Sequence, residues 1–447
     1  MNTPDTPSKH ARRDVLRLAV PVMLSNGTVP LVGIVDTAVM SRMGSPEWMA
    51  ATAVGAVIFS SIFWVFGFLR MATGGLVAQA YGANNLQSTS RISIRALLLA
   101  LLLGTLLIAL QIPLLKIALF AMDDSGEWQG LAADYFYVRI YAAPATLCMY
   151  AILGALIGLQ RVRAVLGLQL LLNLLNVLLT IVLFMTTDLG IKGVALATVI
   201  SEYVTLAAGI YLIKDLMMSA LRDTVIKSWI FERAALRHFF TISGDLFIRT
   251  LCLTFAFYWM TALSAKQGVI ILAANTVLFN LVHFASYVMD GYAHAVESLT
   301  GFAIGRRDTK MLKRSVSASV YLASISAIVF SIFFWLLGEP IVNLLVAEDS
   351  ARQMALDWLP WVIAAPLFGI WSFLLDGIFI GATETRSMRD SMLISLACFM
   401  ISAAVLVPSF GNHGIWISYF ILLVIRALTL WLRWPRIVRA TQQLEHG

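Results

Sequence analysis

The chain has 447 residues, of which 60% are hydrophobic and only 13% are charged, and its mean hydropathy is +0.83. About one residue in four is charged in a soluble domain, so this composition excludes a soluble protein and predicts a polytopic membrane protein. The apolar runs do not alternate with polar residues, which excludes a membrane β-barrel and leaves an all-α fold. The net charge of +7 indicates basic cytoplasmic loops rather than a nucleic-acid partner.

Twelve apolar segments follow one another along the chain, each long enough to cross a hydrocarbon core of about 30 Å as a helix. Their approximate ranges are 14–42, 50–80, 92–120, 130–159, 163–186, 190–213, 236–264, 271–304, 312–338, 352–381, 388–410 and 413–433. With the N-terminus placed inside, 23 Lys and Arg residues fall on the inner side and 6 on the outer side. This bias predicts twelve transmembrane helices with both termini in the cytoplasm.

Short motifs recur in the second half of the chain at a nearly constant offset. Gly154-x3-Gly158 matches Gly377-x3-Gly381 at an offset of 223, and Ala142-Ala-Pro144 matches Ala364-Ala-Pro366 at an offset of 222. Six spans is an even number, so both copies enter the membrane from the same side, as parallel repeats do. We expect two six-helix lobes related by a pseudo-two-fold axis along the membrane normal. The N-lobe is expected at 1–213, a cytoplasmic linker at 214–235 and the C-lobe at 236–447.

Asp36 is a carboxylate inside the first predicted span, toward its far end, and the span also contains Pro21 and Pro30. An ionised carboxylate within the bilayer costs at least about 2.5 kcal/mol on insertion scales. A carboxylate is tolerated within a span where it faces a water-filled cavity, pairs with another group or takes up a proton. Asp36 is therefore the first candidate for a functional residue, with a satisfied structural acid as the alternative.

The other polar residues of the N-lobe spans fall into two groups. Asn173, Asn176 and Thr180 are spaced so that they share one helix face, and Thr198 and Glu202 lie one turn apart on the next helix. They are candidates for a polar site together with Asp36. Amides and hydroxyls also join neighbouring helices in membranes, so a structural role for each of them stays open.

In the C-lobe, Asp290, His294 and Glu297 lie on one face of a predicted helix. Carboxylates and imidazoles bind zinc, which would be the site of an intramembrane metalloenzyme. The chain has no HExxH motif and no second group of ligands, so we expect these side chains to line a polar cavity or to bond across helices. Asp290 and Glu297 remain secondary candidates for the transport site.

Four further charged residues lie within the spans. Asp245 and Arg249 are four residues apart and are expected to pair with each other. Asp376 precedes Gly377 near a helix end and is expected to be structural. Arg70 lies in mid-span, where it either pairs with a buried acid or faces the inner cavity, and it is a further secondary candidate.

No motif predicts a cofactor or a metal. The stretch from Gly74 to Gly82 follows no strand and lacks the Lys-Ser/Thr of a phosphate-binding loop, which argues against an ATP-driven pump. The three cysteines have no metal-site or disulfide spacing. We expect no enzymatic activity, and transport driven by an ion gradient is what remains.

Several stretches, taken together, resemble the MATE family of multidrug and toxic-compound extruders, and specifically its DinF-like branch. They cover nearly the whole chain. The main ones are Leu24-Ser-Asn-x-Thr-Val-Pro-Leu31 with Val35-Asp-Thr-Ala-Val39, Phe68-Leu-Arg-Met-x-Thr73, Asn173-Leu-Leu-Asn176, Ala197-Thr-Val-Ile-Ser-Glu-Tyr203, Asp290-Gly-x-Ala-x-Ala-Val-Glu297 and Asp376-Gly-x-Phe-Ile-Gly-Ala-Thr383.

The resemblance implies antiport of amphipathic, often cationic, organic compounds against protons or sodium. It places the chain among the lipids of the bacterial cytoplasmic membrane, and two lobes in one chain make a monomer sufficient. Asp36 matches the family's coupling acid, Pro21 matches the proline at which the first helix bends, and Asn176 and Thr198 match polar residues of the same site. Related members have an aspartate at the position of Thr180.

With Thr180 in that position the pocket keeps one carboxylate, which holds sodium poorly but can bind and release a proton. We therefore expect a proton-coupled exporter. The alternatives are a sodium-coupled exporter and a flippase for lipid-linked sugars or polysaccharides, for which Arg70 and Arg249 could supply basic charge. The metalloenzyme and a purely structural scaffold are the alternatives from other classes.

Overall fold

The computed structural model describes residues 9–43, 46–120, 128–221 and 229–446, without the side chains of residues 29–43, 46, 220 and 221. The regular elements of this described part are helical throughout. Contacts divide the chain into two compact units, which we describe separately. The N-unit comprises Leu24–Ala80 and Asn85–Arg237, and the C-unit comprises Met1–Met23, Tyr81–Asn84 and His238–Gly447. The lobe boundaries proposed from the sequence remain a prediction.

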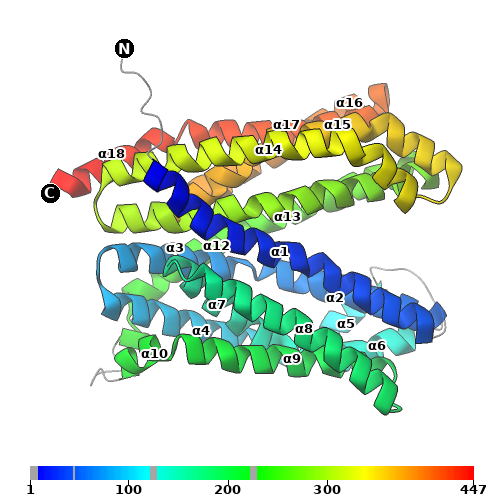
Figure 1. Cartoon of the computed structure of the whole chain (residues 1–447), viewed down its shortest axis with the longest axis horizontal. Helices are drawn as coiled ribbons and strands as arrows, with labels where there is room; N and C mark the ends of the chain where they lie inside the picture. Colours follow the sequence, from blue (N-terminus) through cyan, green and yellow to red (C-terminus); the bar gives the residue numbers. More distant parts are fainter. Residues whose placement is uncertain (1–8, 44–45, 121–127, 222–228, 447) are drawn as a thin grey trace. The chain divides into compact units, whose positions relative to one another are not determined.

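The N-unit is built from the second part of the first helix and the helices that follow it (Figure 1). Helix α8 packs along α9, α4 along α7, and α6 packs against both α2 and α9. Its elements are α1 (Lys9–Met43, from Leu24 onward), α2 (Pro46–Val65), α3 (Phe68–Gly82, up to Ala80), α4 (Leu86–Ala109), α5 (Gln111–Phe120), α6 (Trp128–Arg139), a 3-10 turn η1 (Ile140–Ala142), α7 (Ala143–Gly158), α8 (Val162–Thr186), α9 (Ile191–Leu212) and α10 (Lys214–Leu221).

The C-unit contains the first part of α1 and the long helices of the second half of the chain (Figure 1). Helix α13 packs along α15 and α14, α16 packs along α17, and α18 contacts α14. Its further elements are α12 (Arg233–Gln267, from His238 onward), α13 (Val269–Gly305), α14 (Thr309–Leu345), α15 (Asp349–Gly381), α16 (Thr385–Phe410), α17 (Asn412–Trp431) and α18 (Trp434–His446).

Polar residues begin several of these helices. Asn85 precedes α4 and accepts a hydrogen bond from the backbone N of Ser88 at 2.9 Å, and Asp308 precedes α14 and accepts one from Met311 at 2.7 Å. Side-chain oxygens at this position satisfy backbone N–H groups that have no partner within the helix. These polar residues therefore fix where apolar helices start.

Eleven helical stretches in the described part are long and apolar enough to cross a membrane, and they coincide with the second to twelfth predicted spans. The first predicted span lies within α1, a helix of 35 residues. Three predicted spans contain interruptions. The span 92–120 breaks at Leu110, between α4 and α5, and the span 130–159 contains η1, which ends two residues before Pro144. The span 50–80 breaks at Phe66 and Gly67, between α2 and α3. Proline cannot donate its backbone hydrogen bond and clashes with the preceding turn, which accounts for the second interruption.

The repeated glycines pack in equivalent ways in the two units. In the N-unit, Gly154 and Gly158 of α7 abut the backbone oxygens of Arg70 and Gly74 on α3. In the C-unit, Gly377 and Gly381 of α15 abut the backbone oxygens of Ala293 and Glu297 on α13. Every residue of the second set lies 223 positions after its counterpart in the first set. The predicted internal repeat is therefore also a repeat of helix packing, in which only glycine permits the close approach.

Candidate functional site

Helices α8 and α9 of the N-unit meet at a small polar cluster. Nδ2 of Asn176 donates a hydrogen bond to Oγ1 of Thr198 at 2.9 Å, and the Thr198 hydroxyl donates in turn to the backbone oxygen of Val194 at 3.2 Å. Asn176 is 5% exposed and Thr180, one turn further along α8, is fully buried. Asn176, Thr180 and Thr198, which the sequence analysis grouped, therefore lie on the facing sides of two packed helices.

Two buried polar atoms of this cluster have no hydrogen-bond partner among the described residues. They are Oδ1 of Asn176 and Oγ1 of Thr180. An unsatisfied buried polar atom costs about 1–3 kcal/mol, so such atoms are few in folded proteins and each requires an explanation. The amide oxygen of Asn176 can accept a hydrogen bond from a group outside the described residues, and the hydroxyl of Thr180 can donate one to such a group or accept one from it.

Helix α1 is joined to α8 by a side-chain hydrogen bond near this cluster. Nδ2 of Asn173 donates to Oγ1 of Thr28 at 2.8 Å, and the Thr28 hydroxyl donates to the backbone oxygen of Ser25 at 2.7 Å. Gln169 donates from Nε2 to Oδ1 of Asn173 at 3.1 Å. The contact fixes the register of α1 against α8 within the N-unit. Asn173 is thus a helix-joining residue, one of the two roles considered for it.

The helical backbone of α1 continues through Asp36, but the Asp36 side chain lies outside the described residues. Pro21 also lies inside α1, where it removes one backbone hydrogen bond. Residues up to Met23 belong to the C-unit and residues from Leu24 onward belong to the N-unit, so α1 changes unit two residues after Pro21.

Glu202 lies one turn beyond Thr198 on α9 and faces Arg139 at the end of α6. Oε1 of Glu202 is 3.7 Å from Nη2 of Arg139, and the exposed fractions of the two side chains are 8% and 11%. The hydroxyl of the adjacent Tyr203 donates to the backbone oxygen of Tyr141 at 3.0 Å, which ties α9 to η1. The structure therefore places Glu202 in an ion pair, where the sequence analysis had grouped it with the amides and hydroxyls.

In the C-unit, the expected pairing of Asp245 with Arg249 is wrong. Both side chains of α12 reach across to neighbouring helices: Arg249 binds Asp376 of α15, and Oδ1 of Asp245 accepts from Nη1 of Arg389 on α16 at 2.8 Å. Opposite charges on facing helices, in a buried setting, are stronger partners than an i, i+4 neighbour on the same helix.

Asp376 is held by a second arginine as well. Arg426 of α17 donates to both carboxylate oxygens of Asp376, from Nη2 and, at 3.3 Å, from Nε. All three groups are buried, with exposed fractions of 7% for Arg249, 5% for Asp376 and 2% for Arg426. This triad links α12, α15 and α17, as expected for a structural role of Asp376.

Two side chains of the predicted face of α13 contact each other. Nδ1 of His294 lies 3.4 Å from Oε2 of Glu297, which is 1% exposed, whereas Asp290 is half-buried. Arg70 is half-buried on α3. Within the described ranges, no three His, Cys, Asp or Glu side chains gather as metal ligands.

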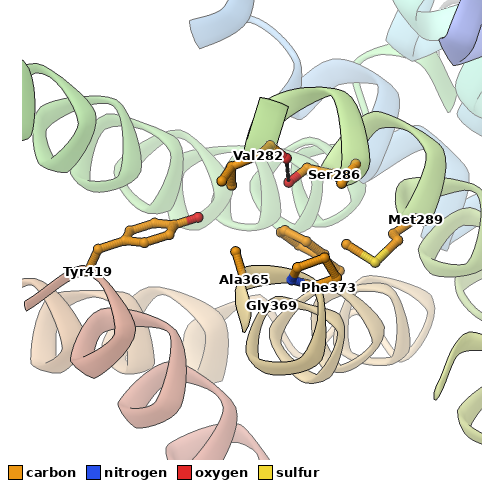
Figure 2. Close-up of a pocket in the computed structure, with 9 residues that line it drawn as sticks. Val282, Ser286, Met289, Ala365, Gly369, Phe373 and Tyr419 are labelled. Atoms are coloured by element: carbon orange, nitrogen blue, oxygen red, sulfur yellow. Dashed lines mark hydrogen bonds between the residues drawn. The ribbon is translucent and has the colours of Figure 1, made fainter. Parts of the chain in front are cut away.

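A pocket in the C-unit opens between α13, α15 and α17 (Figure 2). Its walls are apolar except for the hydroxyls of Ser286 and Tyr419, and Ser286 donates to the backbone oxygen of Val282 at 2.9 Å. The pocket has no room for a water molecule. It is a packing crevice, and we assign it no ligand.

The sequence analysis missed three residues near the N-unit cluster: Thr28, Gln169 and Arg139. Gln169 and Asn173 are spaced i, i+4, and Thr28 belongs to a polar stretch, Ser25-Asn-Gly-Thr28, inside an apolar span. Arg139 interrupts the apolar segment 130–159 but was counted among the outer basic residues. A search for isolated polar residues inside spans finds all three.

The helices and their buried polar cluster define a multi-pass helical membrane protein. The MatE family model matches the chain twice, over residues 21–182 and 246–408. The chain is 38% identical to DNA damage-inducible protein F of Escherichia coli over 421 residues, covering 94% of this chain and 91% of that protein. It is 26% identical to a probable multidrug resistance protein NorM of Pseudomonas putida, covering 87% and 85%.

Among solved structures, the fold is similar to an outward-facing conformation of a multidrug resistance MATE family transporter of the MOP superfamily. The TM-score is 0.88, with 20% sequence identity and 97% of each chain covered. The chain belongs to the MatE family. It is therefore a transporter and not an enzyme, which removes the metalloenzyme alternative, and the predicted all-α membrane fold is confirmed.

Proposed function

We propose that the chain is a proton-coupled exporter of amphipathic organic compounds and that Asp36 is its coupling acid. The observation that carries this proposal is the pair of unsatisfied buried atoms, Oδ1 of Asn176 and Oγ1 of Thr180. A carboxyl group that alternates between its charged and neutral forms can accept from a hydroxyl in one state and donate to an amide oxygen in the other.

The register of α1 supports Asp36 as that group. From the contact between Thr28 and Asn173, eight residues of α1 rise about 12 Å to Asp36, and seven residues of α8 rise about 10 Å to Thr180. Both helices run in the same direction within the N-unit (Figure 1). The backbone of residue 36 therefore lies near the level of Thr180, which carries one of the two unsatisfied atoms, and about one and a half turns of α1 beyond the level of Asn176.

The mechanism follows from the charge of Asp36. When the protein opens to the outside, Asp36 takes up a proton, loses its charge and donates a hydrogen bond to Oδ1 of Asn176. Because Pro21 interrupts the hydrogen bonding of α1, the helix can bend there, and the bend reduces the N-lobe space that holds the substrate. Release of the proton to the cytoplasm resets the helix.

The substrates, in this proposal, are small amphipathic organic compounds, many of them cationic. The names of relatives support this class: the Pseudomonas putida relative is a probable multidrug resistance protein, and the structural neighbour is a multidrug resistance transporter. The protein would act as a monomer in the bacterial cytoplasmic membrane, with both termini in the cytoplasm.

Sodium coupling is the second candidate, because amide and hydroxyl oxygens such as those of Asn176 and Thr180 are sodium ligands. Thr180 gives the cluster no second carboxylate, and a hard cation is held less firmly as the number of charged ligands falls. We therefore favour the proton. The flippase alternative is not removed, because Arg249 and Arg426 share the single carboxylate of Asp376.

The test is export by the purified protein in liposomes, with proton and sodium gradients imposed separately. The expected result is efflux driven by the proton gradient alone, and its loss in Asp36→Asn, which keeps the shape of the side chain but cannot titrate. The variant should remain folded. Undiminished proton-driven export by Asp36→Asn would refute the role of Asp36, and efflux driven only by sodium would select the second candidate.

A further inference from the structure

The side chain of Arg139 occupies a cage inside the N-unit. Its guanidinium carbon lies 5.4 Å from the ring centre of Phe59 and 5.6 Å from that of Phe63, both on α2. On another side it faces Glu202 of α9, with 3.7 Å between Nη2 and Oε1. A positive group over aromatic faces and beside a carboxylate is the arrangement with which proteins recognise organic cations.

The aromatic wall of this cage is buried and its rings pack against one another. The rings of Phe59 and Phe63 are 5.6 Å apart, and the Phe59 ring is stacked on Phe136 at 5.1 Å. Phe59, Phe63 and Phe136 are buried, with exposed fractions of 3%, 6% and 0%. Gly55 allows the ring of Tyr135 to lie against the backbone of α2, so the wall spans α2 and α6.

Arg139 is held loosely for a buried cation. Its contact with Glu202 is longer than a hydrogen bond, and Nη1 is buried without a hydrogen-bond partner in the described part of the chain. By contrast, the buried Arg426 of the C-unit donates to both carboxylate oxygens of Asp376. Arg139 is therefore stabilised by its charge and by its contacts with the ring faces, as an organic cation would be. Few hydrogen bonds hold it in place.

Arg139 and Glu202 also lie within membrane-spanning helices, where a charged side chain costs free energy. Glu202 is at the middle of the 22-residue helix α9, and Arg139 falls inside the candidate span Trp128–Gly158. Charges at that depth are rare and mark substrate or ion pathways by default. A carboxylate at mid-span needs a positive charge, and in this structure Arg139 supplies it while its guanidinium lies over the rings of Phe59 and Phe63.

We propose that Arg139 is an internal counter-cation that occupies a cation-binding cage formed by Glu202, Phe59 and Phe63, and that an organic cation binds there by displacing the Arg139 guanidinium. The inference rests on the proposed export of organic compounds and names a binding site for the cationic ones. Arg139 then determines specificity, because only cations whose charge and aromatic contacts outcompete a guanidinium enter the cage.

The test is equilibrium binding of radiolabelled tetraphenylphosphonium to the full-length protein in nanodiscs, with no gradient. Substitutions of Arg139 and of Glu202 should change the binding affinity in opposite directions. Arg139→Ala removes the competitor and should tighten binding about tenfold, a change of about 1.4 kcal/mol. Glu202→Gln removes the attracting charge and should weaken binding, and the double variant should lose the gain of Arg139→Ala.

A matched control is the exposed ion pair of the same two helices, Lys192 of α9 and Asp134 of α6, 3.2 Å apart. Lys192→Ala removes one positive charge from that pair and should leave the affinity unchanged. Should Arg139→Ala not fold, Arg139→Gln, which retains most of the side-chain length, takes its place with the same expectation. Unchanged affinity in the Arg139 variant, or weaker binding in both Arg139 and Glu202 variants, overturns the proposal in favour of a structural ion pair.

The test is independent of the coupling mechanism. The gain from Arg139→Ala should persist in an Asp36→Asn background, because binding without a gradient requires no proton exchange. If Asp36→Asn retains export while Arg139→Ala still tightens binding, the coupling proposal fails and the cage stands. If Asp36→Asn loses export and Arg139→Ala has no effect, the cage fails and the coupling proposal stands.

Discussion

Asn176 on α8 donates a hydrogen bond from Nδ2 to Oγ1 of Thr198 on α9 over 2.9 Å, and this bond determines which way the amide points. With Nδ2 engaged toward α9, the unsatisfied oxygen of Asn176 is directed elsewhere in the cluster, together with the hydroxyl of Thr180. If Asp36 exchanges protons with this cluster, Thr198 is a positioning residue that acts through Asn176.

Replacing Thr198 with valine removes the acceptor and keeps the shape of the side chain. The buried Nδ2 group of Asn176 then lacks a partner, at a cost of about 1–3 kcal/mol, and the amide is free to turn. We expect proton-driven export to fall about tenfold, since 1.4 kcal/mol corresponds to a factor of ten. Initial efflux rates in liposomes measure the effect.

The control for this variant is Thr186→Val, also a threonine of the α8–α9 pair. Thr186 is exposed near the end of α8 and donates only to the backbone oxygen of Val182. It should export at the normal rate. Equal rates in Thr186→Val and Thr198→Val would mean that the orientation of Asn176 does not matter for export.

Replacing Thr180 with aspartate should change the ion dependence of transport. The variant gives the cluster a second carboxylate at a fully buried position, and a cation with two anionic ligands is held more firmly than with one. We expect sodium to stimulate export or binding in Thr180→Asp. Thr180→Asn has nearly the same shape without the charge and should not respond, and a sodium response in both variants would exclude the charge as its cause.

Much of this fold could be predicted from the sequence because the physical signals are local. A run of about 20 apolar residues is sufficient to mark a span, and eleven predicted spans coincide with apolar helices of the described part. The glycine pairs were visible as a repeat because close helix packing tolerates no other residue there. Helical periodicity alone placed Asn176 and Thr180 on one face, and the resemblance to the MATE family added Thr198 to the same site.

The partners of buried charges could not be predicted, because they depend on contacts between helices far apart in the sequence. Arg249 has an acid four residues away and yet binds Asp376, 127 positions further on. Glu202 was a candidate for the polar site, whereas its partner Arg139, 63 positions earlier in the chain, was not among the candidates. Pro144 and Pro366 occupy matching positions in the repeat, yet only Pro144 follows a 3-10 turn, whereas Pro366 lies inside the continuous helix α15.

The glycine contacts predict a stability difference within the chain. In Gly154→Ala and Gly381→Ala, the new Cβ atom would overlap the backbone oxygen of Arg70 or Glu297, and backbone atoms of a packed helix cannot move aside readily. Overpacking of this kind costs about 1–3 kcal/mol. We expect each variant to unfold at a lower temperature than the parent protein in detergent.

Two other glycines provide the comparison. Gly167 of α8 and Gly244 of α12 are exposed, and a Cβ atom added to either would meet nothing within 4 Å. Alanine at these positions should leave the unfolding temperature unchanged or raise it slightly, since alanine is favoured over glycine in a helix by about 0.5–1 kcal/mol. Equal unfolding temperatures for all four variants would contradict the packing argument.

Asp376→Asn should lower the stability of the folded protein and not only its transport rate. The substitution leaves the buried Arg249 and Arg426 without their shared anion, and breaking a buried ion pair from one side costs about 3–5 kcal/mol. Asp349→Asn breaks the ion pair of an 86% exposed aspartate with Arg352 and should cost no more than about 1 kcal/mol. The measurement is the yield and unfolding temperature of each variant. Because the triad joins α12, α15 and α17, Asp376→Asn should lose folded protein, whereas a folded variant without export would instead make Asp376 part of the transport site.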